Sequence, residues 1–409
     1  MRNKTICVLA LMAGSVGVFA QTNSTTRIEE PANDWKPATS NQQGKLYPQV
    51  NSEGRVRARV IASGAQSVQL DLGGVKYPLF KGDDGAWIGY SKPQDEGFHY
   101  YQLNIDGASV PDPGSLYFYG ASRWGSGVEI PAHDEDFYAL KNVPHGQLRQ
   151  VFFFSKNAGT NLRCYVYTPP GYETEPATRY PVLYIQHGGG EDETSWGSQG
   201  RTPFILDNLI AAGKARPFII VMANSYVPGA DFGFGATNQP ALSDTPYSRA
   251  IGGPGGRRYS PAAFACVLIE DLIPFVDMNF RTLADQPHRA MAGLSMGGMQ
   301  TRSIAPANLD KFSHIGIFSG GSIATNDVVD LTAFKEKVKL VFVSCGSREV
   351  AGNRSGGSRG AFGGDPKLNV EALKAAGINA HYYISPDTAH EWQSWRRSLH
   401  EFAPLLFQN

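Results

Sequence analysis

Six apolar runs between residues 181 and 385 constrain the fold more than any other feature of the sequence. They read PVLYIQ, PFIIVMA, HRAMAGLS, FSHIGIFSG, KLVFVSCG and AHYYIS. Short runs with little polar alternation are typical of strands that are buried on both faces of a sheet. Helical spacing appears in FILDNLIAAG and over residues 261–279, 296–306 and 366–377. This alternation predicts an α/β fold, a mostly parallel sheet wrapped by helices as in α/β-hydrolases, over residues 145–409.

The N-terminal third follows a different rhythm. Val56, Ala58 and Val60 alternate with arginines, and the turn sequences GDDG and PQDEG separate further short segments. Alternation with frequent turns predicts a small all-β sandwich of the immunoglobulin type over residues 46–130. From about residue 112 no clear period is visible, and we expect a linker at residues 131–144.

The first residues indicate export. A charged start is followed by an apolar run and by the small residues Val18 and Ala20, which predicts a cleaved signal peptide over residues 1–20. We therefore expect a secreted or periplasmic protein, with residues 21–45 as a flexible leader. No stretch reaches the roughly 18 uninterrupted apolar residues of a membrane helix, so no membrane association is expected.

Charge and cysteine content exclude further classes. Lys and Arg number 37, as do Asp and Glu, and no basic face for nucleic acid or anionic lipid is visible. Cys164, Cys266 and Cys345 lie in apolar segments, which favours buried thiols over a disulfide framework, although a single pair stays open. Nothing in the sequence indicates an oligomeric state.

The string MAGLSMGGMQ places Ser295 between Gly293 and Gly297, where a predicted strand ends and a predicted helix begins. This spacing is typical of a nucleophile elbow, because the tight turn leaves room only for glycine on either side. A plain strand-to-helix turn is the alternative. The choice depends on whether partners for a nucleophilic serine lie elsewhere in the chain.

A glycine-rich loop offers the first partner. In QHGGG, after the run PVLYI, the backbone N–H groups of Gly189 or Gly190 could meet a developing oxyanion together with the N–H of Met296. A phosphate-binding loop is disfavoured because no Gly-Lys-Ser/Thr follows. We interpret His187 as a buried structural residue.

A base and an acid follow in the chain order that α/β-hydrolases use. His390 comes after the last predicted strand and is the expected base. A zinc helix is excluded there because Ser394 stands where a second histidine is needed. Glu349 follows the preceding strand and is the expected acid, with Asp365 and Asp387 as alternatives.

Candidate substrate contacts come from the segment ANSYVPGADFGFG and from one earlier tryptophan. We expect Asn224, Tyr226, Phe232 and Trp196 to line a pocket for an aromatic acyl group, with simple packing as the alternative. A serine mechanism of this kind needs no metal and no organic cofactor.

Residues 145–407 resemble the esterase D group of α/β-hydrolases, in particular carbohydrate esterase family one, which contains feruloyl and acetylxylan esterases. The stretches that carry the resemblance include YVYTPPGYE, YIQHGGGEDETSW, HRAMAGLSMGGMQT, CGSRE and TAHEWQSW. By this resemblance Ser295, His390 and Glu349 take the triad positions, and Met296 and the glycine loop take the oxyanion positions. Many relatives carry aspartate at the position of Glu349.

The first domain is similar to carbohydrate-binding modules of family forty-eight through GAWIGY, GFHYYQLNIDG and VPDP. That resemblance implies glycan binding, and a structural cap over the active site is the alternative.

Taken together, these features predict a secreted serine esterase that removes feruloyl or acetyl groups from plant cell-wall polysaccharide such as arabinoxylan. Three alternatives stay open. They are a siderophore lactone esterase of the enterochelin type, an acyltransferase, and a non-catalytic glycan-binding protein on a hydrolase scaffold.

Overall fold

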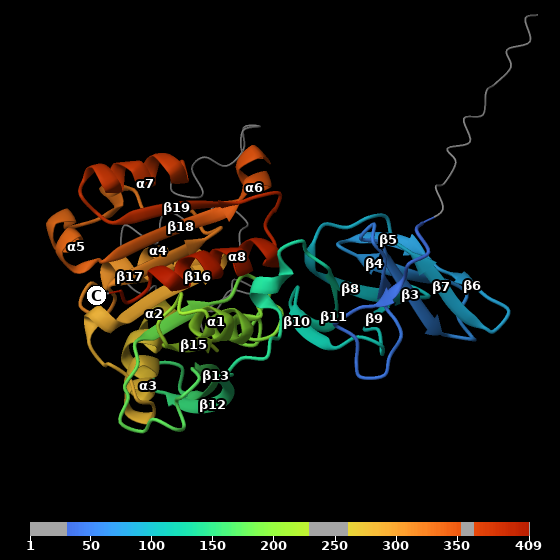
Figure 1. The fold of residues 1–409 in the computed structure, drawn as a ribbon, viewed down its shortest axis with the longest axis horizontal. Coiled ribbons are helices and arrows are strands. Elements are labelled where there is room, and N and C mark those ends of the chain that lie inside the picture. Colours follow the sequence, from blue (N-terminus) through green and yellow to red (C-terminus); the bar gives the residue numbers. More distant parts are fainter. Residues whose placement is uncertain (1–30, 229–260, 353–363, 409) are drawn as a thin grey trace, which may run out of the picture.

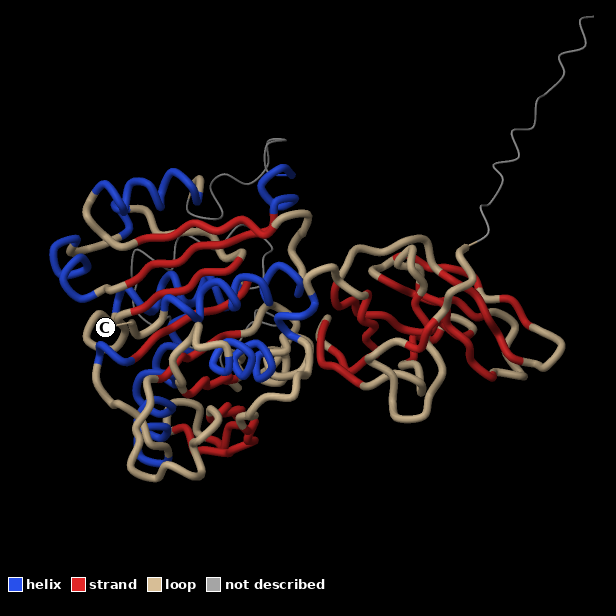
Figure 2. Tube along the Cα trace, in the orientation of Figure 1, coloured by secondary structure: helices blue, strands red, loops and turns tan. Residues whose placement is uncertain are grey.

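The computed structural model describes residues 31–228, 261–352 and 364–408, which form a sandwich domain and an α/β domain side by side (Figure 1). The expected signal peptide and Phe232 lie outside the described residues. Within residues 31–130 the regular elements are all strands, whereas helices flank the sheet of the α/β domain (Figure 2). The fold class expected from the sequence is therefore confirmed.

Two antiparallel sheets form the sandwich domain. The first has, in spatial order, β1 (Lys36–Pro37), β2 (Gln49–Val50), β3 (Val56–Ile61), β7 (Ala86–Tyr90) and β6 (Phe80–Lys81). The second has β10 (Tyr117–Gly120), β11 (Arg123–Ile130), β8 (Gly97–Ile105), β4 (Val68–Leu72) and β5 (Val75–Pro78), with β9 (Ala108–Val110) paired to β8. Alternate residues such as Val56, Ala58 and Leu70 fill the core between the sheets.

The structure adds a strand before the expected start of this domain, and it gives regular structure to the stretch in which no period was visible. β1 lies inside the expected flexible leader, where it pairs with β2. The stretch without a clear period contains the β10–β11 hairpin. Its pattern is hidden because Gly125 and Gly127 sit where the side chains of Gln102 and Phe98 cross the strand, so that a Cβ at Gly127 would lie 2.4 Å from the Phe98 ring. These glycines therefore serve close packing within a strand.

The α/β domain is built on an eight-stranded sheet. Its spatial order is β12 (Gln147–Ser155), β13 (Thr160–Thr168), β15 (Ile219–Ala223), β14 (Val182–Gln186), β16 (Arg289–Leu294), β17 (His314–Phe318), β18 (Leu340–Gly346) and β19 (Ala380–Ser385). The six strands from β14 to β19 run parallel, and they are the six apolar runs of the sequence. Among the described strands, the β12–β13 hairpin is the part that joins this sheet antiparallel.

Helices cover both faces of this sheet, which explains why its strands are apolar throughout. In β14, Val182 and Tyr184 belong to one core cluster, whereas Leu183 and Ile185 belong to the other. The first cluster is covered by α2 (Pro261–Cys266), the π-helical turn η2 (Val267–Leu272), α3 (Ile273–Asn279), α4 (Met296–Ala307), α5 (Leu331–Lys337) and α7 (Pro366–Ala375). The second is covered by α1 (Thr202–Ala211) and α8 (Trp392–Phe402).

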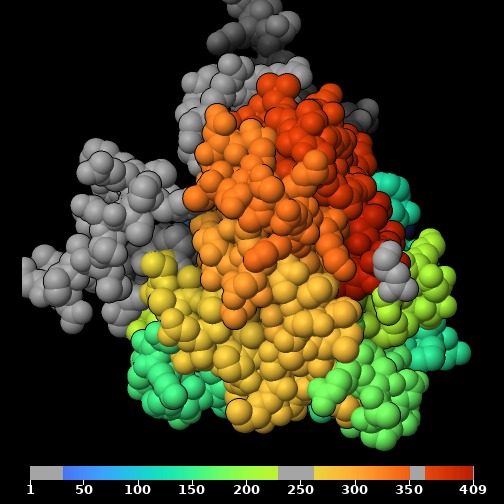
Figure 3. All heavy atoms as spheres, turned by 90° about the vertical axis from the view of Figure 1, so that its left-hand side faces the viewer, coloured from blue at the N-terminus to red at the C-terminus, as the bar shows by residue number. Residues whose placement is uncertain are grey.

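The remaining short elements are α6 (Ser347–Gly352) and the 3₁₀ turns η1 (Glu135–Tyr138), η3 (Gln286–His288), η4 (Thr325–Asp327) and η6 (Ala403–Leu405). Seen from the end opposite the sandwich domain, the yellow to orange residues that follow residue 260 occupy the middle of the α/β face (Figure 3). Among the described residues, no helix is both long and apolar enough to cross a membrane. Cys164 and Cys345 are buried free thiols as expected, whereas Cys266 is exposed.

The two domains share a buried interface through β8. Its residues alternate between two cores, because Tyr101 and Leu103 pack inside the sandwich domain while Phe98 and Tyr100 join the α/β core. The segment expected as a linker also packs there, since Asn208 of α1 donates hydrogen bonds to the carbonyl oxygens of Phe137 and Ala139. The sandwich domain is thus part of the packing of the α/β domain.

Candidate active site

Ser295 occupies a strained turn between β16 and α4. Its φ of 50° lies in a region that residues other than glycine rarely adopt. The N–H of Ser295 donates to the carbonyl oxygen of Phe318 at 2.8 Å, which holds the turn. A Cβ on Gly293 would lie 2.4 Å from the backbone of Gly297, and a Cβ on Gly297 would lie 2.6 Å from the carbonyl oxygen of Gln186. The two glycines are therefore required by close backbone approach, as in a nucleophile elbow.

His390 lies in the loop between β19 and α8, and it connects Ser295 to Glu349. Its Nε2 is 2.8 Å from Ser295 Oγ, and its Nδ1 is 2.9 Å from Glu349 Oε2. Because the carboxylate accepts, the tautomer with the proton on Nδ1 fits this arrangement and leaves Nε2 free to accept the serine proton. Trp395 packs edge-on to the imidazole, with ring centroids 5.2 Å apart.

Glu349 lies in the first turn of α6, and its carboxylate accepts hydrogen bonds from three groups. Its Oε1 accepts from the Ser319 hydroxyl at 2.7 Å and from the Gly346 N–H at 2.8 Å, while Oε2 faces His390. Burial works to raise the pKa of Glu349, but the hydrogen bonds and the charge of His390 together hold that pKa below its usual value. The group is therefore suited to orient the imidazole and to stabilise its cation.

The two alternative acids lie elsewhere. Asp365 is the N-cap of α7 and accepts from the N–H groups of Lys367 and Leu368. Asp387 is exposed on the loop that precedes His390, with a φ of 53°. Of the three carboxylates considered, Glu349 is the one that the structure brings to His390.

A hydroxyl bonded to an imidazole that is bonded to a carboxylate can form an acyl-enzyme with an ester. Residues 155–406 match the protein family described as "Putative esterase". The chain belongs to this esterase family. It is also 44% identical over 387 residues to an endo-1,4-beta-xylanase/feruloyl esterase of Xylanibacter ruminicola, an alignment that covers 93% of this chain and 48% of that protein. The chain thus spans about half the length of that relative.

Solved structures show the same fold as this esterase. A carbohydrate esterase family one ferulic acid esterase from Anaeromyces mucronatus aligns with a TM-score of 0.50 at 20% identity, over 68% of this chain and 96% of that one. An enterochelin esterase from Shigella flexneri aligns with a TM-score of 0.54 at 14% identity, over 92% of this chain and 95% of that one. At these identities the likeness concerns the fold alone, and in the second case it extends over both domains.

The glycine loop of the esterase passes directly beside Ser295. A Cβ on Gly188 would lie 3.5 Å from Ser295 Cβ. Met296 is the first residue of α4, so its N–H has no acceptor within the helix. Within the described part of the chain, the N–H of Gly189 makes no hydrogen bond. These two N–H groups remain the candidates for an oxyanion site.

Gly190 differs from the sequence expectation. Its N–H donates to the hydroxyl oxygen of Tyr226 at 2.8 Å, so this group is engaged. Its carbonyl oxygen accepts from the N–H of Ser122, at the turn of the β10–β11 hairpin. Gly190, the neighbour of the candidate donor Gly189, is thus held by Tyr226 of the α/β domain and by Ser122 of the sandwich domain. The oxyanion role expected for Gly190 is therefore not supported.

Of the expected substrate contacts, two lie beside the glycine loop and one does not. Tyr226 is half-buried and meets Gly190, and the Asn224 side chain accepts from the Tyr226 N–H at 2.9 Å. Trp196 corrects the sequence expectation, because only 1% of it is exposed. Its ring packs edge-on to Trp392, and its N–H donates to the Gln186 carbonyl oxygen at 2.9 Å. Trp196 is therefore a core residue of the α/β domain.

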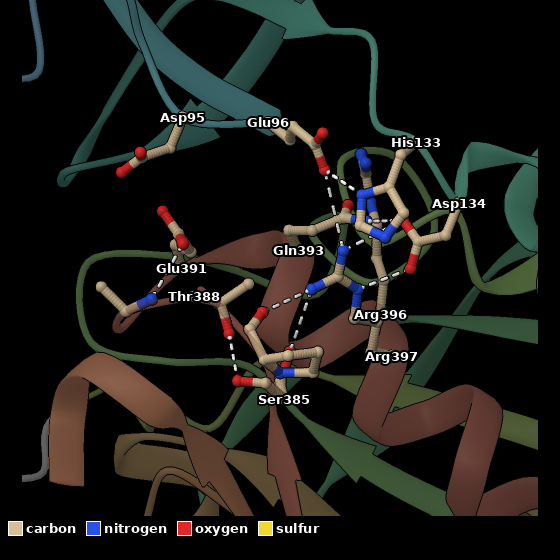
Figure 4. A network of polar contacts seen from close by, with 12 residues as sticks. Asp95, Glu96, His133, Asp134, Ser385, Thr388, Glu391, Gln393, Arg396 and Arg397 are labelled. Carbon is tan, nitrogen blue, oxygen red and sulfur yellow. Dashed lines mark hydrogen bonds and ion pairs between the residues drawn. The ribbon is translucent and has the colours of Figure 1, made fainter.

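A polar cavity of about 290 Å³ lies between the domains, and Figure 4 shows several of the side chains that line it. Its lining comprises Gln94, Asp95, Glu96, His133, Arg348, Pro386, Asp387, Thr388, Gln393 and Arg397. Within the described residues, Glu96, His133 and Asp134 form the group whose ligand atoms come close enough for a metal ion. Arg397 lies among them and donates to Asp134 at 2.7 Å, so a cation there would meet a guanidinium.

Proposed function

We propose that this esterase hydrolyses feruloyl esters of xylan-type plant polysaccharide, with Ser295 as nucleophile, His390 as general base and Glu349 as the acid that orients it. The observation that carries the proposal is the pair of hydrogen bonds of His390, at 2.8 Å to Ser295 and 2.9 Å to Glu349. The substrate class is supported by the 44% identity to a protein described as a xylanase and feruloyl esterase.

The reaction proceeds by two acyl transfers. Ser295 Oγ attacks the ester carbonyl carbon while its proton passes to His390 Nε2, and the resulting oxyanion accepts from the N–H groups of Met296 and Gly189. The intermediate collapses, the sugar hydroxyl leaves with the proton from His390, and a feruloyl ester of Ser295 remains. Water then attacks with the same base, which releases ferulate and regenerates the serine. Loss of one oxyanion donor costs about 3 kcal/mol in such sites.

The decisive experiment compares initial rates of the purified protein on methyl ferulate, acetylated xylan and a catecholate trilactone, each beside Ser295→Ala. Release of ferulate that is lost in the variant supports the proposal, and faster release of acetate moves the assignment to acetylxylan. Preference for the trilactone would make the chain a siderophore esterase, and an enterochelin esterase with a solved structure shares the fold of both domains. If none of the three substrates is hydrolysed, the acyltransferase and the non-catalytic glycan-binding protein remain. An assay of acyl transfer to a sugar acceptor then distinguishes these two.

Two further properties are part of the proposal. Export is inferred from the signal-type sequence of residues 1–20. The mass of the protein recovered from the growth medium or periplasm shows whether these residues have been removed. Glycan binding by the sandwich domain follows from its resemblance to carbohydrate-binding modules. Retention of Ser295→Ala protein on insoluble arabinoxylan tests it, and passage without retardation would contradict it.

A further inference from the structure

The hydroxyl of Tyr100 reaches from the sandwich domain into the α/β domain. It donates to Glu191 Oε1 at 3.0 Å, and it accepts from Gln199 Nε2 at 2.6 Å and from Trp392 Nε1 at 3.2 Å. One donor and two acceptor positions are all that a phenol offers, so this hydroxyl is fully used. All three partners belong to the α/β domain.

Glu191 connects this hydroxyl to the glycine loop. Only 5% of Glu191 is exposed, and its second oxygen, Oε2, accepts from the Gly188 N–H at 3.1 Å. A Cβ on Gly188 would lie 3.3 Å from this oxygen and 3.5 Å from Ser295 Cβ. Gly188 is therefore adjacent both to the Glu191 carboxyl and to the serine.

The same hydroxyl also contacts the segment that carries the imidazole. Trp392 begins α8 two residues after His390, and its indole N–H donates a hydrogen bond to the Tyr100 hydroxyl. Burial raises the pKa of Glu191 to about 7, against the opposing effects of the Gly188 and Tyr100 hydrogen bonds and the charge of His390. A carboxyl so unfavourably buried is costly to the fold, and such groups gather at functional sites.

We propose that Tyr100 and Glu191 are positioning residues, which hold residues 188–190 against Ser295 so that the Gly189 N–H can receive the oxyanion. The sandwich domain thereby completes the active site. This inference rests on the proposed role of Ser295. Its physical basis is preorganisation, because an oxyanion donor contributes only when it is fixed at hydrogen-bond distance before the charge develops.

The test compares Tyr100→Phe with Tyr101→Phe. Tyr101 is the next residue of β8, is 2% exposed, and donates to the Asp112 carboxylate at 2.8 Å inside the sandwich domain. Both variants lose a hydrogen bond from a tyrosine to a carboxylate, so both should melt at lower temperature. Tyr100→Phe also loses the hydrogen bonds from Gln199 and Trp392 and should be the less stable of the two. Only Tyr100→Phe should lower kcat on methyl ferulate, by about 10- to 100-fold, with KM changed by less than about two-fold.

Variants of Glu191 provide an independent measurement if Tyr100→Phe fails to fold. Glu191→Gln keeps the shape and one acceptor, so it should retain more kcat than Glu191→Ala. In the double variant, Tyr100→Phe should add little to Glu191→Ala, because the hydroxyl acts on the loop through the carboxyl. Fully multiplicative losses of kcat would overturn the inference.

A second readout does not depend on the natural substrate. A fluorophosphonate probe esterifies a nucleophilic serine with loss of fluoride, and intact mass reports the rate. If wild-type protein is labelled but does not hydrolyse methyl ferulate, the proposed function is wrong and this inference can still be tested. Tyr100→Phe should then be labelled about tenfold more slowly than Tyr101→Phe. Equal labelling rates in the two folded variants would overturn the inference, and so would the absence of labelling in wild type.

Discussion

Arg396 of α8 and Glu129 of β11 form a buried ion pair between the two domains. The guanidinium donates to both carboxylate oxygens, at 2.6 and 3.0 Å, and also to the carbonyl oxygen of Gln199. Arg396 is 0% exposed and packs over the ring of Tyr138 at 4.5 Å. The buried guanidinium of Arg396 is therefore compensated by a carboxylate of the other domain, and separation of the domains would leave both charges without a partner.

Removal of one member of this pair should destabilise the whole chain. We expect Glu129→Gln to lower the free energy of unfolding by about 3 to 5 kcal/mol, because it leaves an uncompensated buried guanidinium. Denaturant unfolding of the full chain measures this. The exposed pair of Asp95 and Arg348 also spans the domains and serves as the control. Asp95→Asn should cost less than about 1 kcal/mol, and equal losses would contradict the argument.

The choice between Glu349 and Asp365 can be tested by kinetics. Glu349→Gln removes the charge that orients His390 and should lower kcat by several orders of magnitude, up to about 10⁴-fold, as for buried triad acids in general. Asp365→Asn leaves an N-cap residue at the start of α7 and should leave kcat at the wild-type level. If the two variants exchanged these effects, the acid would be misassigned.

Glu191 should make stability depend on pH. Its pKa of about 7 lies above the 4.5 of an unperturbed glutamate, so the folded state binds more protons than the unfolded state between these values. Its contribution to stability is therefore lost as the pH rises from 4.5 to 7, by about 3 kcal/mol at most. The titratable groups that act on it are Tyr100 and His390.

The measurement is the free energy of unfolding of wild type and Glu191→Gln across this range. Wild type should lose stability relative to the variant as the pH rises. Parallel curves would mean that Glu191 titrates normally.

Trp196 should matter for stability and not for substrate binding. Its ring is packed against Trp392 and Phe318, so Trp196→Ala should cost about 3 to 5 kcal/mol. The conservative variant Trp196→Phe keeps most of the volume and should show an unchanged KM for methyl ferulate. A raised KM in stable Trp196→Phe protein would restore the pocket role.

Much of the site could be predicted from the sequence because its signals are local. The requirement for glycine at Gly293 reflects its close approach to the backbone of Gly297 within the turn. The order of Ser295, Glu349 and His390 follows from which strands end before them. Parallel strands bring their carboxyl ends to one edge, so their loops must meet there. The register of β16, β17 and β18 confirms that arrangement of the strands.

The contacts of Trp196 and Tyr100 could not be predicted in this way. An aromatic residue after a glycine loop can line a pocket or enter the core, and only the packing of the Trp196 ring against Trp392 and Phe318 decides. In β8 the sequence places Tyr100 and Tyr101 on opposite faces, but it does not say which face meets the second domain.

By itself, the sequence determined the six parallel strands of the α/β domain, the elbow at Ser295 and the place of His390 after the last strand, because burial on both faces and tight turns restrict residue types locally. Only the tertiary structure decided that Gly190 is bonded to Tyr226, that Trp196 is buried, and that Tyr100 supports the loop beside the serine. Those relationships join residues from different elements and domains. Their distances depend on how whole surfaces pack, which no local pattern of residues encodes.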